Sequence, residues 1–318
     1  EITKEELTIG ASNTIIVDKD GKEIANLSSD EKRKIISLSK MSEYLPKAYV
    51  AIEDKRFYDH NGVDIKRTAG AIIGVLTKNS SYGGSSITQQ LVKNVTNDKE
   101  RSGLAGITRK VKEWAKAIQV ERMISKDQIL ELYLNIIYVG GSNLHGVELG
   151  SIYYFNKSAK DLSLAECAFL AGINSRPAYY DPFTEHKNIT QEELGKERTK
   201  KVLTVLAEMK DQGLIQDENL YNQAVEEANA GLKFEKGNTD KNSSYSYHTD
   251  EVIRTVKKQL MEEKNWSDKM AEAYIYGSGL TIYSTQDSSI QAAVEEEFAK
   301  TKYQIKGQLK NADGSLKN

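Results

Sequence analysis

The sequence is poor in the residues that build metal centres and disulfide frameworks. It has one cysteine, Cys167, and four histidines scattered over 318 residues. A single cysteine excludes an internal disulfide and a cysteine-rich zinc site, and the histidines show no ligand spacing. We therefore expect no metal site built on His or Cys and no tightly bound cofactor.

Long apolar runs are missing as well. No stretch approaches the 18 residues of a membrane-spanning helix, and there are only three prolines. A mean hydropathy of -0.56 with 28% charged residues is typical of a water-soluble globular chain. Because the first residue is Glu rather than Met, we expect a soluble piece of a longer, membrane-anchored protein.

The whole chain has nearly equal numbers of positive and negative residues, but one segment has an excess of positive residues. The net charge is -2. Residues 53–126 hold 14 Lys and Arg against 8 Asp and Glu, a local charge of +6, which leaves -8 for the remainder. A protein that attracts nucleic acid is usually basic over its whole surface. A positive charge confined to one segment therefore favours a smaller anionic ligand. A solvated helix face is the alternative.

Helical periodicity dominates the centre of the sequence, so the chain is predicted to be mainly α. The predicted helices are residues 47–58, 65–76, 86–95, 107–123, 126–137, 146–155, 163–173, 190–210 and 249–264. A hairpin of residues 14–17 and 22–24 precedes them, and a strand at 279–284 follows. The segment 79–85, rich in Gly and Ser, is predicted to be a flexible loop before a helix.

The first candidate site is the acidic pair Glu53 and Asp54 at the end of an apolar helix, followed by Phe57 and His60. A carboxylate at the edge of a core can act as a general base or acid. The alternative is a surface pair balanced by neighbouring bases. We expect Asp54, Phe57 and His60 to shape the loop around Glu53 rather than to react.

The second candidate is the glycine loop that enters the helix at Ser86. Ser85, Gln89 and Gln90 present hydroxyl and amide groups there, and Lys93 lies one turn below. Unpaired N–H groups and hydroxyls at a helix N-terminus can bind phosphate. The alternative is an ordinary serine-capped helix.

The third candidate is a basic helix in which Glu113 is the lone acid. Arg109, Lys112 and Lys116 are predicted to line one side of it, and the packing side is predicted to be Val111, Trp114, Ala115 and Ile118. Glu113 is expected to stay ionised or to hold a cation. The alternative is salt bridging along a solvated helix.

Taken together and in this order, these stretches resemble the family-51 peptidoglycan glycosyltransferases of class A penicillin-binding proteins. The motifs that carry the resemblance are Glu53–Gly62, Gly83–Gln90, Arg109–Glu113, Lys126–Asn135 and Arg176–Pro182. The resemblance implies a hairpin and linker at 1–40, a glycosyltransferase domain at 41–225, and a linker leading into a missing transpeptidase domain at 226–318. The implied fold is a lysozyme-like lobe with a smaller lobe, whose mobile part includes residues 66–82, and a short α/β linker region.

The resemblance implies that the chain polymerises lipid II with inversion and releases undecaprenyl pyrophosphate. Glu53 would take the proton from the acceptor hydroxyl, and Glu113 would stabilise the donor side or a Mg²⁺ ion near the pyrophosphate. Ser85, Gln89, Gln90, Lys93, Arg101, Arg109 and Lys112 would bind the substrate. A lysozyme-like hydrolase and a non-catalytic wall-binding module are the alternatives.

The sequence departs from the family pattern at Gly70, where the family often has an arginine that binds substrate phosphate. Arg67, one helical turn earlier, is predicted to substitute for it, or else to be a solvated helix residue. The implied partners are the growing glycan strand, the membrane surface, moenomycin-type inhibitors and cell-wall synthesis proteins. The implied location is the extracytoplasmic face of the bacterial cell membrane, with an anchoring N-terminal helix outside this chain.

Overall fold

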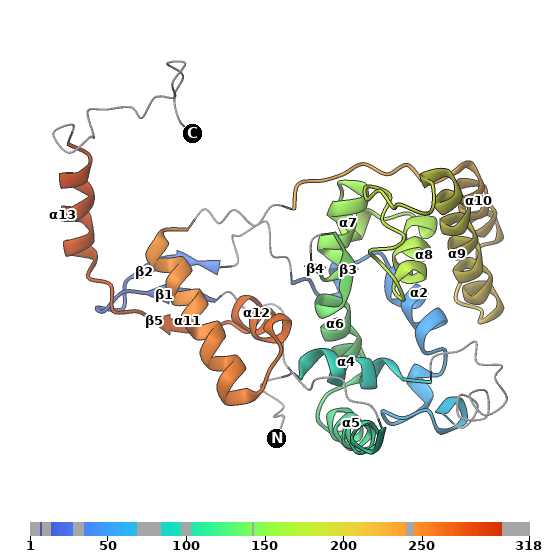
Figure 1. Cartoon of the computed structure of the whole chain (residues 1–318), viewed down its shortest axis with the longest axis horizontal. Coiled ribbons are helices and arrows are strands. Elements are labelled where there is room, and N and C mark those ends of the chain that lie inside the picture. The colour runs from blue at the N-terminus through green and yellow to red at the C-terminus, as the bar shows by residue number, and fades with distance from the viewer. Residues whose placement is uncertain are drawn as a thin grey trace.

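The computed structural model describes residues 7, 14–27, 35–68, 84–96, 103–141, 143–239 and 245–300. These residues are mainly helical, which confirms the predicted fold class (Figure 1). The helices are α2 (Tyr44–Glu53), α4 (Ile87–Val95), α5 (Gly103–Met123), α6 (Lys126–Ile136), α7 (Val147–Phe155), α8 (Leu164–Ile173), α9 (Gln191–Asp211), α10 (Glu218–Ala230), α11 (Tyr247–Lys264), α12 (Asp268–Gly277) and α13 (Ser288–Phe298). Short 3₁₀ helices are η2 (Leu38–Lys40), η3 (Phe57–Asp59) and η4 (Ala159–Asp161).

The helical body is built around the apolar helix α8, all of whose residues are buried. Helices α2, α9 and α10 pack against α8, and α4 packs against α5 and α6. One continuous apolar core joins these helices. The loop before α2 is tied to this body by Asn135, whose side chain exchanges hydrogen bonds with the backbone of Ile36 at 3.0 and 2.8 Å.

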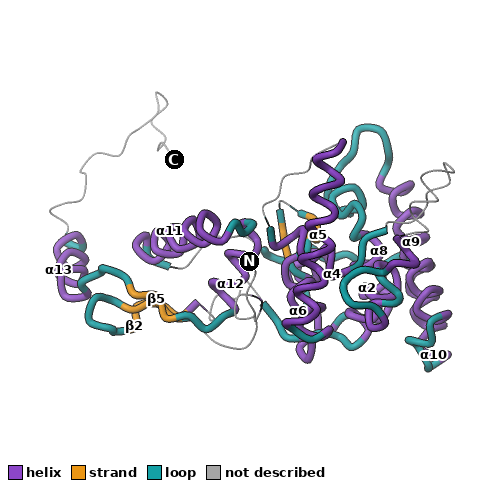
Figure 2. Tube along the Cα trace, turned by 90° about the horizontal axis from the view of Figure 1, so that it is seen from below, coloured by secondary structure: helices purple, strands orange, loops and turns teal. Residues whose placement is uncertain are grey.

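Short strands form a three-stranded sheet in the order β2 (Glu23–Asn26), β1 (Ile15–Val17), β5 (Thr281–Tyr283). β1 pairs with β2 as the predicted hairpin, and it pairs in parallel with β5 from the other end of the chain. Helices α11 and α12 lie beside this sheet (Figure 2) and share a second, small apolar core with it. α12 also contributes Met270, Ala271 and Ala273 to the core of the helical body. A two-stranded ribbon of β3 (Tyr138–Gly140) and β4 (Leu144–His145) precedes α7.

Most helix starts follow from side chains that the sequence displays. Ser125 and Ser163 form capping boxes with Gln128 and Glu166, and Ser86 caps α4 by accepting from the N–H of Gln89. These caps fix where each helix begins, and therefore which residues form its first turn.

Several elements differ from the sequence prediction. α2 ends at Glu53 rather than at residue 58, because Asp54 leaves the helical conformation with φ of -158° and its side chain caps another helix instead. The helices α12 and α13 and the ribbon β3–β4 were not predicted. The predicted mobile segment, 66–82, lies outside the described residues except for 66–68.

No helix in the described part of the chain is both long enough and apolar enough to cross a membrane.

Candidate active site

Glu53, the last residue of α2, is held by two amide side chains. Its Oε2 accepts a hydrogen bond from Gln90 Nε2 on α4 at 2.9 Å, and its Oε1 accepts one from Asn174 Nδ2, just after α8, at 2.9 Å. The residue is partly buried. The carboxylate is therefore fixed in orientation while both oxygens keep lone pairs for a further proton donor.

Tyr133 on α6 links the two amides. Its hydroxyl donates to Gln90 Oε1 at 3.0 Å and accepts from Asn174 Nδ2 at 3.1 Å. Burial, together with the nearby charge of Glu53, raises the pKa of Tyr133 well above its ordinary value. The phenol therefore stays protonated and keeps both amide groups turned with their N–H groups toward Glu53.

Asp54 and His60 form a buried pair next to Glu53. The Nε2 atom of His60 lies 2.9 Å from Asp54 Oδ2, and the same carboxylate oxygen accepts the N–H of Ile87 at 2.9 Å. A carboxylate at the start of α4 is favourable because the N-terminal N–H groups carry partial positive charge. Asp54 thus joins the end of α2 to the beginning of α4, as its predicted supporting role requires.

The loop between these two helices is packed closely on α5. Gly62 has φ of +90°, and a Cβ there would lie 2.7 Å from the carbonyl oxygen of Ala117. Its own carbonyl accepts a hydrogen bond from Ser86 Oγ at 2.5 Å. Phe57 is fully buried, with the ammonium group of Lys126 4.4 Å from its ring centre. These contacts fix the loop around the candidate base.

Glu113 lies on α5, which packs against α4, and its side chain is buried. It pairs with Arg109 Nη1 at 3.0 Å and with the ammonium group of Lys110. Lys110 Nζ also donates to Ser85 Oγ at 2.8 Å and to Gln89 Oε1 at 3.4 Å. Because Gln89 and Gln90 are neighbours on α4, this one turn of helix connects the surroundings of Glu113 with those of Glu53.

Buried donors without acceptors lie on α4 and α5 beside Glu113. Gln89 Nε2, Arg109 Nε and Trp114 Nε1 are covered from solvent and have no hydrogen-bond partner among the residues that the structure describes. A buried polar group without a partner costs free energy unless a ligand satisfies it. Three donors of this kind favour a ligand that supplies acceptors.

The structure corrects the predicted orientation of α5. Val111 is 54% exposed and Ile118 is 36% exposed, whereas Glu113 and Ala117 are buried. The packing side is therefore rotated from the predicted one, because ion pairs with Arg109 and Lys110 make it possible to bury the carboxylate. Lys112, which was grouped with Glu113, is exposed and forms no hydrogen bond or ion pair with the described residues.

Other predicted binding residues take different places. Lys93 is exposed in the last turn of α4. The guanidinium of Arg67 donates to the carbonyl oxygen of Glu53, which places it at the C-terminal end of α2. Arg101 and Gly70 lie outside the described residues, so the roles predicted for these two positions stay predictions.

The sequence reasoning missed three residues of the site, namely Lys110, Tyr133 and Asn174. Each lies inside or beside a motif that was recognised: Lys110 between Arg109 and Glu113, Tyr133 in the motif on α6, and Asn174 two residues before Arg176. Periodicity does not show which residues of a motif meet across helices, so no local signal distinguished them.

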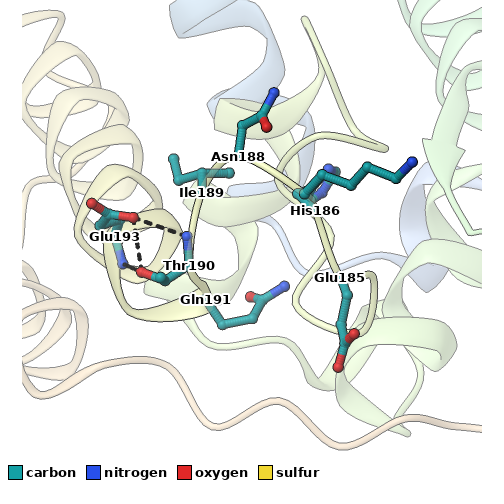
Figure 3. Close-up of a pocket in the computed structure, with 8 residues that line it drawn as sticks. Glu185, His186, Asn188, Ile189, Thr190, Gln191 and Glu193 are labelled. Atoms are coloured by element: carbon teal, nitrogen blue, oxygen red, sulfur yellow. Dashed lines mark hydrogen bonds between the residues drawn. The ribbon is translucent and has the colours of Figure 1, made fainter.

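Two surface pockets lie apart from Glu53 and Glu113, and the second of them is lined in part by His60. One, of about 500 Å³, lies at the start of α9, where Thr190 and Glu193 cap each other (Figure 3). The other, of about 690 Å³, lies between the His60 loop and α5 and includes the ion pair of Arg56 with Asp64. Burial would raise the pKa of Asp64, but hydrogen bonds from Arg56 and from the N–H of Arg67 outweigh it, so the pKa is lowered. Neither pocket contains Glu53 or Glu113.

Within the described residues, no three His, Cys, Asp or Glu side chains are grouped so that they could hold a metal ion.

The sequence is similar to known proteins over most of its length. The family model described as "Transglycosylase" matches residues 20–209. Penicillin-binding protein 1A of Clostridium botulinum is 39% identical over 285 residues, which cover 87% of this chain and 33% of that protein. Penicillin-binding protein 1F of Bacillus subtilis is 35% identical over 317 residues, covering 99% of this chain and 40% of that protein.

This chain therefore spans about a third of the length of the curated relatives that it matches. Among solved structures, penicillin-binding protein 1A from Haemophilus influenzae matches 98% of this chain and 33% of its own, at 17% identity and a TM-score of 0.36. A TM-score of this size supports no argument about the site.

Proposed function

This chain belongs to the transglycosylase family, and from that premise we propose that it is a peptidoglycan glycosyltransferase that polymerises lipid II in cell-wall synthesis. The observation that carries the proposal is the pairing of an oriented carboxylate, Glu53, with the unsatisfied donors Gln89 Nε2 and Arg109 Nε. The carboxylate can accept a proton from a sugar hydroxyl, and the donors can form hydrogen bonds to a phosphate. Glycosyl transfer from a lipid-linked pyrophosphate needs both.

On the acceptor side, Glu53 is the general base. The 4-hydroxyl oxygen of the acceptor sugar attacks the anomeric carbon of the donor while its proton passes to the Glu53 carboxylate. Gln90 and Asn174 hold this carboxylate in place, so no rotation is needed before the proton transfer. Attack from the face opposite the leaving group gives inversion at the anomeric carbon.

On the donor side, the bond from the anomeric carbon to phosphate breaks and undecaprenyl pyrophosphate leaves with the electron pair. Negative charge then develops on the phosphate oxygen. Lys110 and Arg109 are held by Glu113 so that their charges are in place before the reaction. In this role Glu113 positions cations.

The surroundings of Glu113 fit a divalent cation poorly. Its two oxygens already contact Arg109 and Lys110, and two positive charges beside a single carboxylate repel Mg²⁺. We therefore derive no step through a metal ion, and a Mg²⁺ requirement remains a prediction from the family resemblance.

Exposed apolar side chains near the site support a contact with the membrane surface, where a polyprenyl substrate resides. Ile65 is 77% exposed, Tyr58 57% and Val111 54%. Ile65 also lines one surface pocket together with Ile118, and a grouping of exposed apolar side chains favours a partner with an apolar surface. Binding of moenomycin-type inhibitors and of other cell-wall synthesis proteins is part of the same proposal and follows from the family resemblance.

Incubation of the chain with lipid II as the only substrate tests the proposal. Elongated glycan, separated by size on a gel, is the expected product. Shortened products from added glycan strands would indicate a lysozyme-like hydrolase, and no product from either substrate would indicate a wall-binding module. Both of these results contradict the proposal.

A further inference from the structure

The end of α4 is joined to α12, which lies outside the stretch matched by the family model (Figure 1). The N–H of Ser267 donates to the carbonyl oxygen of Val95 at 2.8 Å, and the Ser267 hydroxyl donates to the carbonyl oxygen of Asn94. Trp266, which is 2% exposed, pairs with Thr96 in an isolated β-bridge. The first turn of α12 is therefore fixed against the last turn of α4, the turn that carries Lys93.

Lys269 lies in this first turn of α12 and is partly buried. Its ammonium group has one described contact, the side-chain oxygen of Asn94 at 3.5 Å. The two acids nearest to it on α12, Asp268 and Glu272, lie 2.8 and 3.7 Å from the ammonium group of Lys257. Lys269 forms no ion pair with any residue that the structure describes.

This environment is unfavourable for a cation in three ways. Burial and then the charge of Lys93 lower the pKa of Lys269. A positive charge in the first turn of a helix also opposes the helix dipole. The arrangement becomes favourable when an anion with more than one charge lies between Lys93 and Lys269.

We propose that Lys269 joins Lys93 in binding the pyrophosphate of the lipid-linked substrate, so that the donor site extends from α4 onto α12. This inference rests on the proposed function, because it assigns part of the same donor site. The new element is that Lys269, a residue outside the stretch matched by the family model, contacts the substrate. A family-matched domain expressed without residues 245–300 would then lack one of its phosphate-binding cations.

Two probes distinguish the sources of the anion: farnesyl pyrophosphate, which carries a short polyprenyl chain, and inorganic pyrophosphate. Isothermal titration of the whole chain should show Lys269→Gln binding farnesyl pyrophosphate about tenfold more weakly, a typical loss for one charge-assisted contact. Lys269→Arg should stay within about twofold of the unmodified chain, since it keeps the charge. Lys258→Gln on α11, whose side chain is 75% exposed, is the matched control and should change nothing.

Thermal unfolding separates binding from a merely structural role. Without ligand, Lys269→Gln should unfold at the same temperature as the unmodified chain or higher, because the repulsion with Lys93 is removed. With farnesyl pyrophosphate present, it should gain less stability than the unmodified chain. If Lys269→Gln unfolds at a lower temperature without ligand and binds normally, Lys269 only attaches α12 and the proposal is wrong.

The inference and the proposed function fail in different ways. If the unmodified chain elongates lipid II and Lys93→Gln weakens farnesyl pyrophosphate binding while Lys269→Gln does not, the inference is overturned and the function stands. If Lys93→Gln and Lys269→Gln weaken the binding of inorganic pyrophosphate equally but leave the binding of farnesyl pyrophosphate unchanged, the assignment to a lipid-linked substrate is overturned. If the unmodified chain neither binds farnesyl pyrophosphate nor makes glycan, both are overturned.

Discussion

The helical body and the sheet unit both bury carboxylates, but the two regions hold them with different partners. The helical body has a core that joins α2, α4, α6, α8 and α9 and also includes Met270 and Ala271 of α12. Within this region the side chains of Asp54 and Glu113 are buried. The core of the sheet unit consists of six buried residues, Ile16, Leu27, Ile253, Ile275, Tyr276 and Ile282. Burying a carboxylate is costly unless its partners are held rigidly. In the helical body these partners are side chains of His, Arg and Lys. In the sheet unit Asp18 is 2% exposed and is held instead by the N–H groups of Asp20 and Lys22 and by the hydroxyl of Ser288.

The largest expected effect tests whether the network in the helical body serves chemistry. Glu53→Gln removes the base but little volume, so glycan polymerisation should fall by about 10² to 10⁴. The free energy of unfolding should be nearly unchanged. Glu43→Gln, an exposed substitution just before the same helix, is the control for the turnover assay. A Glu53→Gln chain that keeps more than a tenth of the normal turnover would reject the assignment of the base.

The next effect compares the two cores directly. Leu91 in α4 is 0% exposed, and Leu91→Ala should lower the free energy of unfolding by about 2 to 5 kcal/mol with loss of polymerisation. Ile16 in β1 is equally buried, but Ile16→Ala should open the sheet unit at lower denaturant concentration while the helical body stays folded. Hydrogen exchange measured at increasing urea concentration reports the unfolding of the helical body and of the sheet unit separately. A single transition for Ile16→Ala, with simultaneous loss of both regions, would contradict the separation.

A smaller effect tests which lysine of α5 belongs to the site. Lys110→Ala removes a cation that contacts Glu113, Ser85 and Gln89, so kcat/KM for lipid II should fall about 10- to 100-fold. Lys112→Ala, on the same helix but exposed, should change it less than about twofold. Steady-state kinetics measures both variants. A larger loss for Lys112→Ala than for Lys110→Ala would contradict this assignment and would favour the orientation of α5 that its apolar residues predict.

The smallest effect concerns the ion pair of Arg56 with Asp64. Because the pKa of Asp64 is lowered in the folded state, the pair stabilises the fold above the unfolded pKa of about 3.9. That stability is lost as the pH falls through the folded pKa. The free energy of unfolding should therefore decrease as the pH is lowered below about 4, and Asp64→Asn should show a shallower decrease. Chemical denaturation at a series of pH values measures this, and identical slopes for the two chains would contradict it.

The sequence predicted the helices of the body well, because apolar spacing and serine caps are local signals. Glu53, Gln90, Arg109 and Glu113 lie in recognisable motifs and the structure brings them together in one network, while their catalytic and binding roles stay predictions. The helical spacing continued to residue 58 although the apolar stretch ended at the acidic pair, since the reason that α2 stops at Glu53 is a contact of Asp54 with a helix more than thirty residues away. Lys110, Tyr133 and Asn174 were missed for the same reason: their places depend on how helices meet.

The failure on α5 has a different physical cause. Val111 and Ile118 are apolar, and a rule that buries apolar residues turns the helix toward them. The structure instead buries Glu113, whose charge is balanced by two neighbours on the same helix. Periodicity thus fails where a helix carries a buried ion pair on one side and exposes apolar residues on the other.

The parallel pairing of β1 with β5 has a consequence for the order in which the protein is made. Ile15 pairs with Thr281, so the first strand waits for a partner until the ribosome has synthesised the whole helical body. During that interval one edge of β1 has no neighbouring strand, and the buried side chain of Ile16 lacks its contacts with the later helices. The sheet unit can form only after nearly all of residues 1–283 have left the ribosome, whereas the helical body has all of its own residues earlier. Synthesis therefore favours a folded glycosyltransferase body first, with the two distant parts of the chain joined last.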